Sequence, residues 1–192
     1  MNTIDCRLRY LLFIACLWTG VTQAQQHPER FGFGAPASAE DIAAVDIDIK
    51  PDGKALPPGS GTVTEGEVLY NAKCAVCHGI EGVGMPNDRL VVHSPEESFP
   101  DAADVDTWRH RTIGNYWPYA TTVFDYIRRS MPMNLPGSLD ADEVYSLTAY
   151  LLYLNHIVPE DIELDATTLA QIEMPARNRF VPDDRQKYRE VH

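Results

Sequence analysis

The feature that most constrains the fold of this chain is the segment NAKCAVCHGIEG, in which Cys74, Cys77 and His78 form a Cys-x-x-Cys-His motif. Such a motif serves as a redox dithiol, as part of a zinc site, or as an attachment site for haem. A thioredoxin-like dithiol needs a strand before it, and the preceding TVTEGEVLYNAK contains no convincing strand. A structural zinc site needs about four ligands, and no second Cys pair follows.

The haem interpretation needs only the residues that are present. Two thiols two residues apart can form thioethers to the porphyrin vinyl groups, and the adjacent imidazole can reach the iron. We therefore expect Cys74 and Cys77 to attach one covalent haem c, with His78 as an axial iron ligand. The carbonyl of Pro86 is a candidate to orient the outer nitrogen of the His78 ring.

The N-terminus has the layout of a secretory signal peptide. Arg7 and Arg9 precede the apolar run YLLFIACLW, and Ala24 supplies a small residue for cleavage. The run is shorter than the roughly 20 residues that span a bilayer, so we expect no membrane span. Residues 1–24 thus predict export to the periplasm, an oxidising compartment that suits haem c.

Helical patterns flank the motif and predict an all-α fold. A capping box of Thr64 and Glu67 is expected to begin a helix that runs into the motif, with Gly66 allowing another helix to cross closely. A second helix is expected near Asp140, where Glu143 follows three residues later. Its apolar stripe consists of Val144, Leu147, Leu151 and Leu154. Between them, TTVFDYIRRS predicts a short helix with Phe124 and Ile127 inward, and the region 79–119 is mostly loop.

Three Met-Pro pairs offer candidates for the second axial ligand. Met85 follows His78 by only seven residues, too few for a folded loop to reach the opposite haem face. Met131 directly follows a helix, in the Pro-stiffened MPMNLPGS, and is the predicted ligand. Met133 and Met174 remain alternatives. A thioether stabilises ferrous iron and fills the sixth coordination position, so we predict that the haem passes single electrons. We expect the chain to have no catalytic site of its own.

Polar and aromatic residues before the central helix are candidates for the haem pocket. Arg109, Arg111, Tyr116 and Trp117 have the side chains that usually pair with haem propionates. The alternative is that NYWPY is an apolar lid and both arginines are exposed. Arg128 and the neighbouring Arg129 are alternatives for a docking surface.

The order helix, CxxCH, loop, MP, helix resembles the class I cytochrome c family over about 62–157. The block RTIGNYWPYATTVFDYIRRSMPMNLPGSLDADEVYSLTAYLLYLNHIVPED and the leader FGFGAPASAEDIAAVDIDIKPDGKALPPGSGTVTEGEVLY resemble the cytochrome c subunits of the sulfur-oxidising (Sox) sulfane dehydrogenase and of sulfite dehydrogenases. This resemblance implies that a molybdenum-cofactor subunit supplies electrons and that a soluble cytochrome c accepts them. Some Sox-type members carry a second haem domain, and this chain has no second CxxCH, so sulfite and protein-bound sulfane both remain possible substrates.

The resulting organisation is a signal peptide, an extended leader 25–61 that wraps a partner or the haem domain, a monohaem c domain 62–157, and a tail 158–192. A net charge of −12 disfavours nucleic acid and favours cationic electron-transfer partners. The acidic segment SPEESFPDAADVD, which contains Glu97, is a candidate to face such a partner. The alternatives to an electron-accepting dehydrogenase subunit are a freestanding soluble electron carrier, a haem enzyme that oxidises thiosulfate directly, and a haem-based sensor.

Overall fold

The computed structural model describes residues 32–100 and 110–181. The predicted signal peptide and Arg109 lie outside this range. The elements are α2 (Ala39–Val45), β1 (Ser60–Thr62), α3 (Val63–Lys73), α4 (Ala75–His78), the 3-10 turn η1 (Ile80–Gly82), α5 (Ile113–Tyr116), α6 (Ala120–Ser130), α7 (Ala141–Leu154), β2 (Glu163–Asp165), α8 (Ala166–Ala170) and the 3-10 turn η3 (Arg177–Arg179). None of the helices in the described ranges is both long enough and apolar enough to cross a membrane.

Contacts divide the chain into a unit ending at Ala44 and a unit that begins at Val45. The leader contains one helix among its described residues, α2, and it buries no residue. At the start of α2 the Asp41 carboxylate accepts hydrogen bonds from the backbone N–H and the hydroxyl of Ser38, and the Ser38 hydroxyl accepts one from the backbone N–H of Asp41.

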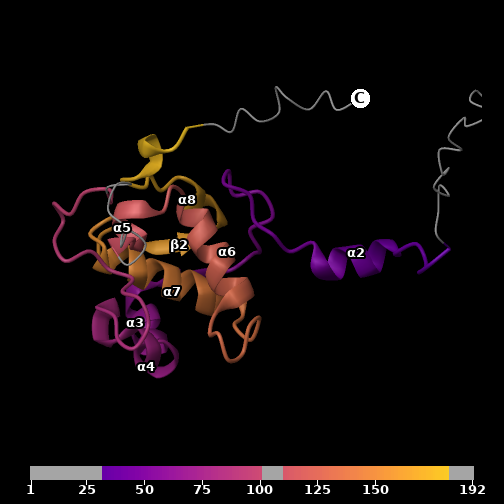
Figure 1. The fold of residues 1–192 in the computed structure, drawn as a ribbon, viewed down its shortest axis with the longest axis horizontal. Coiled ribbons are helices and arrows are strands. Elements are labelled where there is room, and N and C mark those ends of the chain that lie inside the picture. The colour runs from indigo at the N-terminus through magenta and orange to yellow at the C-terminus, as the bar shows by residue number, and fades with distance from the viewer. Residues whose placement is uncertain (1–31, 101–109, 182–192) are drawn as a thin grey trace, which may run out of the picture. The chain divides into compact units, whose positions relative to one another are not determined.

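The centre of the second unit is a close crossing of α3 and α7 (Figure 1). A Cβ atom on Gly66 would lie 2.0 Å from the carbonyl oxygen of Ser146 on α7, so only glycine fits. One turn later Tyr70 is fully buried, and its ring centroid lies 5.5 Å from that of Tyr150. The close approach predicted for Gly66 is therefore confirmed.

Replacement of Gly66 by alanine should force α3 and α7 apart. We expect Gly66→Ala to lower the free energy of unfolding by about 3 kcal/mol, because the added methyl group meets backbone that cannot yield easily. Denaturant unfolding of the purified protein measures this loss. Asn71→Ala, an exposed position on the same helix, is the matched control and should change stability by less than about 0.5 kcal/mol. Equal stabilities of the two variants would contradict the expectation.

The predicted apolar faces of α6 and α7 form the core. Val144, Leu147 and Leu151 are at most 4% exposed, and Phe124 and Ile127 of α6 pack against them in the same cluster. At the start of α7, Asp140 accepts a hydrogen bond from Glu143 N at 2.9 Å, which confirms the predicted capping box.

The start of α3 differs from the prediction. Thr62, not Thr64, is the N-cap, and its hydroxyl accepts a hydrogen bond from Glu65 N at 3.3 Å. The helix therefore begins at Val63, one residue before the predicted cap. This shift buries Val63, which is 3% exposed, and leaves Thr64 and Glu67 in solvent.

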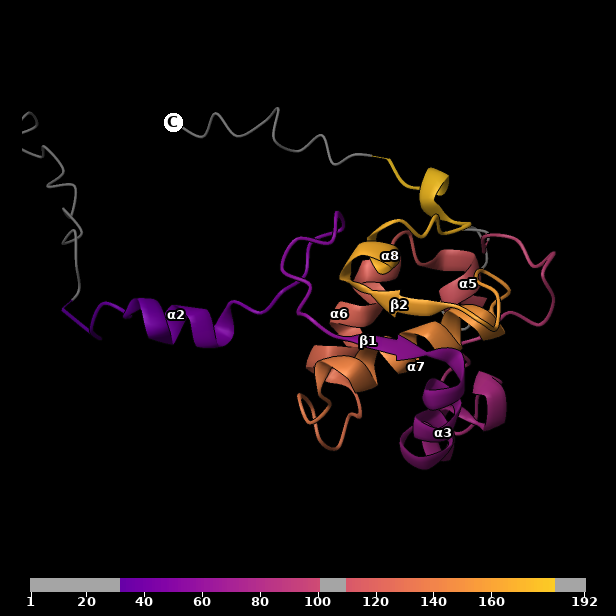
Figure 2. The ribbon, with the colours of Figure 1, turned by 180° about the vertical axis from the view of Figure 1, so that it is seen from behind.

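A two-stranded sheet corrects the all-α expectation in one detail. β1 and β2 pair antiparallel, with Gly61 opposite Leu164 (Figure 2). The pairing brings the C-terminal flank onto the domain, where Leu164, Leu169 and Met174 are at most 3% exposed within the common core. The segment 163–174 therefore contributes to the same core as α3, α6 and α7.

Part of the leader also packs on the helices of this unit. Ile49, which is 5% exposed, donates its backbone N–H to the Asp125 carboxylate on α6 at 3.0 Å. The Tyr145 hydroxyl donates to the carbonyl of Pro57 at 2.9 Å. Arg128, a candidate docking residue, instead donates to the carbonyl of Ile47 at 3.2 Å. The stretch 47–57 thus lies along α6 and α7 of its own chain.

Candidate cofactor site

Cys74, Cys77 and His78 lie on consecutive turns where α3 passes into α4. The backbone N–H of Cys74 donates to the carbonyl of Tyr70 at 2.8 Å, and that of His78 donates to the carbonyl of Cys74 at 3.0 Å. Both cysteines are free thiols and half-buried. Burial raises the pKa of the Cys74 thiol to about 11. A redox-active dithiol requires a lowered thiol pKa, so this environment does not suit that alternative.

The imidazole of His78 is oriented by a single backbone contact. Its Nδ1 atom lies 2.9 Å from the carbonyl oxygen of Asp88. Because a carbonyl only accepts, Nδ1 carries the proton, and Nε2 keeps the lone pair that a metal ligand needs. The prediction that the Pro86 carbonyl accepts this hydrogen bond is therefore wrong. The carbonyl of Asp88, two residues later in the loop, accepts it instead.

The loop after the motif is tied to the motif by backbone hydrogen bonds. Gly84 N donates to the carbonyl of His78 at 2.7 Å, and Asn87 N donates to the carbonyl of Cys77 at 2.9 Å. The buried hydroxyl of Tyr70 donates to the carbonyl of Gly79 at 2.9 Å. The thiols, the imidazole and the carbonyl that orients it are thus held as one unit.

The four described methionines lie in different environments. Met131 ends α6, where its N–H donates to the carbonyl of Ile127 at 3.0 Å, and its half-buried side chain packs against the core. Met85 is 80% exposed and Met133 is 71% exposed, whereas Met174 is 3% exposed within the core. Only Met131 combines contact with the core and access from outside among the described methionines.

The described residues that were predicted for the haem pocket, Arg111, Tyr116 and Trp117, lie in two places. The guanidinium of Arg111 lies 4.5 Å from the centroid of the Tyr116 ring, which contacts Phe99 and Phe180. Trp117 packs against the core and meets the ring of Tyr126 edge-on at 5.6 Å. The structure therefore joins Arg111 and Tyr116 to the C-terminal segment and places Trp117 beside α6.

An ion pair that the sequence did not indicate closes the loop before α5. Arg89 pairs with Glu97, which also accepts hydrogen bonds from His93 N at 2.7 Å and Asn115 Nδ2 at 3.1 Å. The hydrogen bond from Arg89 holds the pKa of Glu97 below its usual value. Glu97 therefore serves an internal contact rather than a partner surface, and much of the remaining acidic segment lies outside the described residues.

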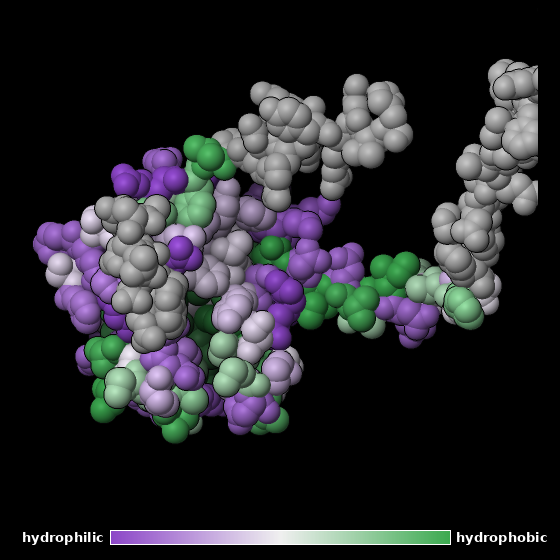
Figure 3. All heavy atoms as spheres, in the orientation of Figure 1, coloured by the Kyte–Doolittle hydropathy of each residue, from purple (hydrophilic) through white to green (hydrophobic). Residues whose placement is uncertain are grey.

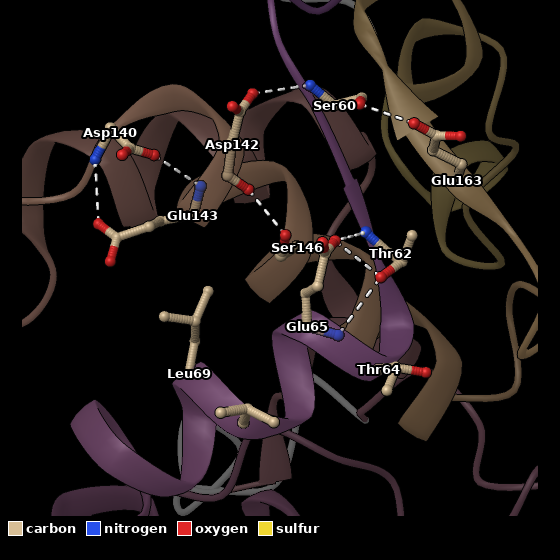
Figure 4. A pocket seen from close by; sticks show the side chains of 11 residues that line it. Ser60, Thr62, Thr64, Glu65, Leu69, Asp140, Asp142, Glu143, Ser146 and Glu163 are labelled. Carbon is tan, nitrogen blue, oxygen red and sulfur yellow. Dashed lines mark hydrogen bonds between the residues drawn. The ribbon is translucent and has the colours of Figure 1, made fainter.

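A groove of about 650 Å³ lies away from the motif, between the starts of α3 and α7 and the small sheet (Figure 4). Its carboxylates already have partners. Asp142 accepts from Ser60 N, Glu163 accepts from the Ser60 hydroxyl, and Glu65 accepts from Thr62. The groove is thus lined by helix caps and strand contacts, and no chemistry is assigned to it.

Exposed apolar side chains surround the motif. Val76, Ile80 and Val83 are between 61% and 77% exposed, and Met85 follows them in the same loop. Apolar surface is visible over the part of the domain where α3 and α4 lie (Figure 3). This apolar surface adjoins the two thiols, as a site for a large apolar cofactor requires.

Comparison with known proteins agrees with this geometry. Residues 61–151 match the family model described as cytochrome c oxidase, cbb3-type, subunit III. One chain in the crystal structure of the sulfane dehydrogenase SoxCD from Paracoccus pantotrophus is 38% identical, with a TM-score of 0.67, and the match covers 84% of this chain and 76% of that chain.

Two curated relatives are named thiosulfate dehydrogenase. The protein from Stutzerimonas stutzeri (strain A1501) is 30% identical over 111 residues, which are 56% of this chain and 32% of that protein. The one from Psychrobacter arcticus (strain DSM 17307 / VKM B-2377 / 273-4) is 30% identical over 112 residues, 51% of this chain and 31% of that protein. The chain thus spans about a third of the length of these curated relatives.

The helix crossing, the CxxCH turn and these matches define a cytochrome with the class I cytochrome c fold, a class that holds c-type haem. Within it, the chain belongs to the cytochrome c family of the Sox sulfane dehydrogenase, as the match to a chain of SoxCD shows. The resemblance recognised from the sequence is therefore confirmed.

Proposed function

We propose that Cys74 and Cys77 attach one haem c covalently and that His78 and Met131 are its axial ligands. The free thiols and the oriented imidazole support the first three assignments. The half-buried position of Met131 directly after α6 supports the fourth. The haem supplies one-electron chemistry, and the protein residues hold it and exclude other ligands from the iron.

The protein in this proposal is the periplasmic, electron-accepting subunit of a molybdenum-dependent sulfite or sulfane dehydrogenase. The observation that carries it is the 38% identity to a chain of SoxCD, which extends over 84% of this chain and therefore beyond the CxxCH domain. A catalytic subunit oxidises the sulfur compound, and a soluble cytochrome c accepts the electrons from this chain. In this organisation residues 1–24 are the signal peptide, 62–157 hold the haem, and the leader 25–61 and tail 158–192 also contact the partner.

Direct oxidation of thiosulfate is the second candidate, because the curated relatives carry the name thiosulfate dehydrogenase. The described residues do not favour it. The match covers about a third of those proteins, and a methionine held against the core beside α6 suits a closed iron site rather than an open one.

The ratio of molybdenum to haem in protein affinity-purified from its native periplasm tests the proposal. We expect nearly equal amounts, together with sulfite- or sulfane-dependent reduction of the haem. A molybdenum content near zero under gentle purification would contradict a stable complex, while leaving the haem assignment intact. Haem reduction by thiosulfate alone, without molybdenum, would favour the second candidate.

A further inference from the structure

The side chain of Asn155 lies where three segments meet. It is 4% exposed and caps the end of α7. Its Oδ1 accepts the N–H groups of Val92 at 3.1 Å and Gly114 at 3.0 Å. Its Nδ2 donates to the carbonyls of Leu90 at 3.2 Å and Leu151 at 2.8 Å. These four bonds fix the orientation of the amide and use both of its N–H donors and both lone pairs of its oxygen.

These bonds hold the loop whose carbonyl orients the His78 ring. Asp88 itself is exposed, and its neighbours in the loop are held by hydrogen bonds. On the motif side the loop is fixed by Asn87 N, which donates to Cys77. On the other side it is fixed at Leu90, whose N–H donates to Gly82 at 2.8 Å and whose carbonyl accepts from Asn155. Asn155 thus contacts the segment that begins two residues after Asp88.

Gly114 shows how closely this arrangement is packed. A Cβ atom at this position would lie 2.5 Å from Oδ1 of Asn155 and 3.0 Å from a methyl group of Val92. The helix start at α5 therefore approaches the amide so closely that only glycine fits without displacing it.

We infer that Asn155 is a positioning residue for the haem iron: through Leu90 and Val92 it sets the place of the Asp88 carbonyl, and so the hydrogen bond to His78 Nδ1. The inference rests on the proposed role of His78 as an iron ligand. An aspartate in place of Asn155 would lack the two N–H donors, and a leucine there would make none of the four hydrogen bonds. A firm Nδ1–H bond makes the imidazole a stronger electron donor, which favours oxidised iron. A loosened loop should therefore favour reduced iron.

The test compares Asn155→Leu, which removes the amide, with Gly114→Ala, which keeps the amide but displaces it. At the potential where the wild type is half reduced, the ratio of reduced to oxidised haem should rise at least about threefold in both variants. The reduction is followed by the visible haem absorption. Thr148→Val is the matched control on the same helix, because it removes only a buried hydroxyl that donates to the Val144 carbonyl at 2.7 Å. Its ratio should stay at the wild-type value.

Unchanged ratios in Asn155→Leu and Gly114→Ala would overturn the inference, as would an equal shift in the Thr148→Val control, which would indicate a general effect of destabilisation. If Asn155→Leu does not accumulate, Gly114→Ala decides. A wild-type protein that contains no haem would refute the proposed function itself, whereas a haem-containing wild type with unchanged variants refutes the positioning role alone.

Discussion

A variant with serine at both Cys74 and Cys77 should lose its covalent haem. Serine cannot form the thioethers, so haem bound in any other way should be removed by acid and organic solvent. We expect the haem retained per protein chain after such extraction to fall at least about tenfold relative to the wild type. The change should be measured on protein expressed with its signal peptide, by the absorption of the extracted pellet.

The same variant should also be far less resistant to thermal unfolding, because a tightly bound group stabilises the folded state that binds it. Asn71→Ser is the matched control, since this residue lies on α3 three residues before Cys74, is exposed, and has no proposed role in the site. It should keep both the haem and the thermal stability. Covalent haem that survives in the double variant would show that the attachment lies elsewhere in the chain.

The elements predicted correctly from the sequence are those whose pattern is local. In α7 the apolar stripe and the Asp140 capping box lie within one stretch of chain, and both appear as expected. Gly66 was informative because a glycine within a helix has a cost that a close crossing explains.

Two capping boxes of equal spacing were available for the start of α3, and tertiary packing determines which one forms. Thr62 with Glu65 and Thr64 with Glu67 have the same spacing, so either pair satisfies a capping box. The earlier start is used because it buries Val63. The strand pairing of Gly61 with Leu164 could not be recognised, since three-residue strands show no periodicity and their partners are about a hundred residues apart.

The candidate site likewise contains residues that a local motif predicts and residues whose contacts depend on the folded chain. The spacing of Cys74, Cys77 and His78 is a local motif, and it could be read directly. The carbonyl that orients His78 could not, because Pro86 and Asp88 are equally plausible until the loop is folded. Asn155 carries no signal in its neighbourhood, since its partners come from residues about 40 to 65 positions away as well as from its own helix.

The second large effect is expected at Met131. Met131→Ala should abolish the methionine-to-iron charge-transfer absorption of the oxidised protein, because the thioether is the proposed source of that band. Loss of the thioether also removes a ligand that favours ferrous iron, so the variant should be harder to reduce. The vacated position should bind added imidazole, and the spectral change on titration measures this directly.

The other methionines supply matched controls for both alternatives. Met133→Ala alters a side chain that is 71% exposed and should leave the band, the ease of reduction and the response to imidazole unchanged. Met174→Ala should lower the free energy of unfolding by about 2–5 kcal/mol, because the side chain is 3% exposed in the core, and should also keep the band. A band that persists in Met131→Ala and disappears in one of these controls would move the distal ligand to that residue. Such a result would also place the iron against a different part of the chain from the α6 terminus.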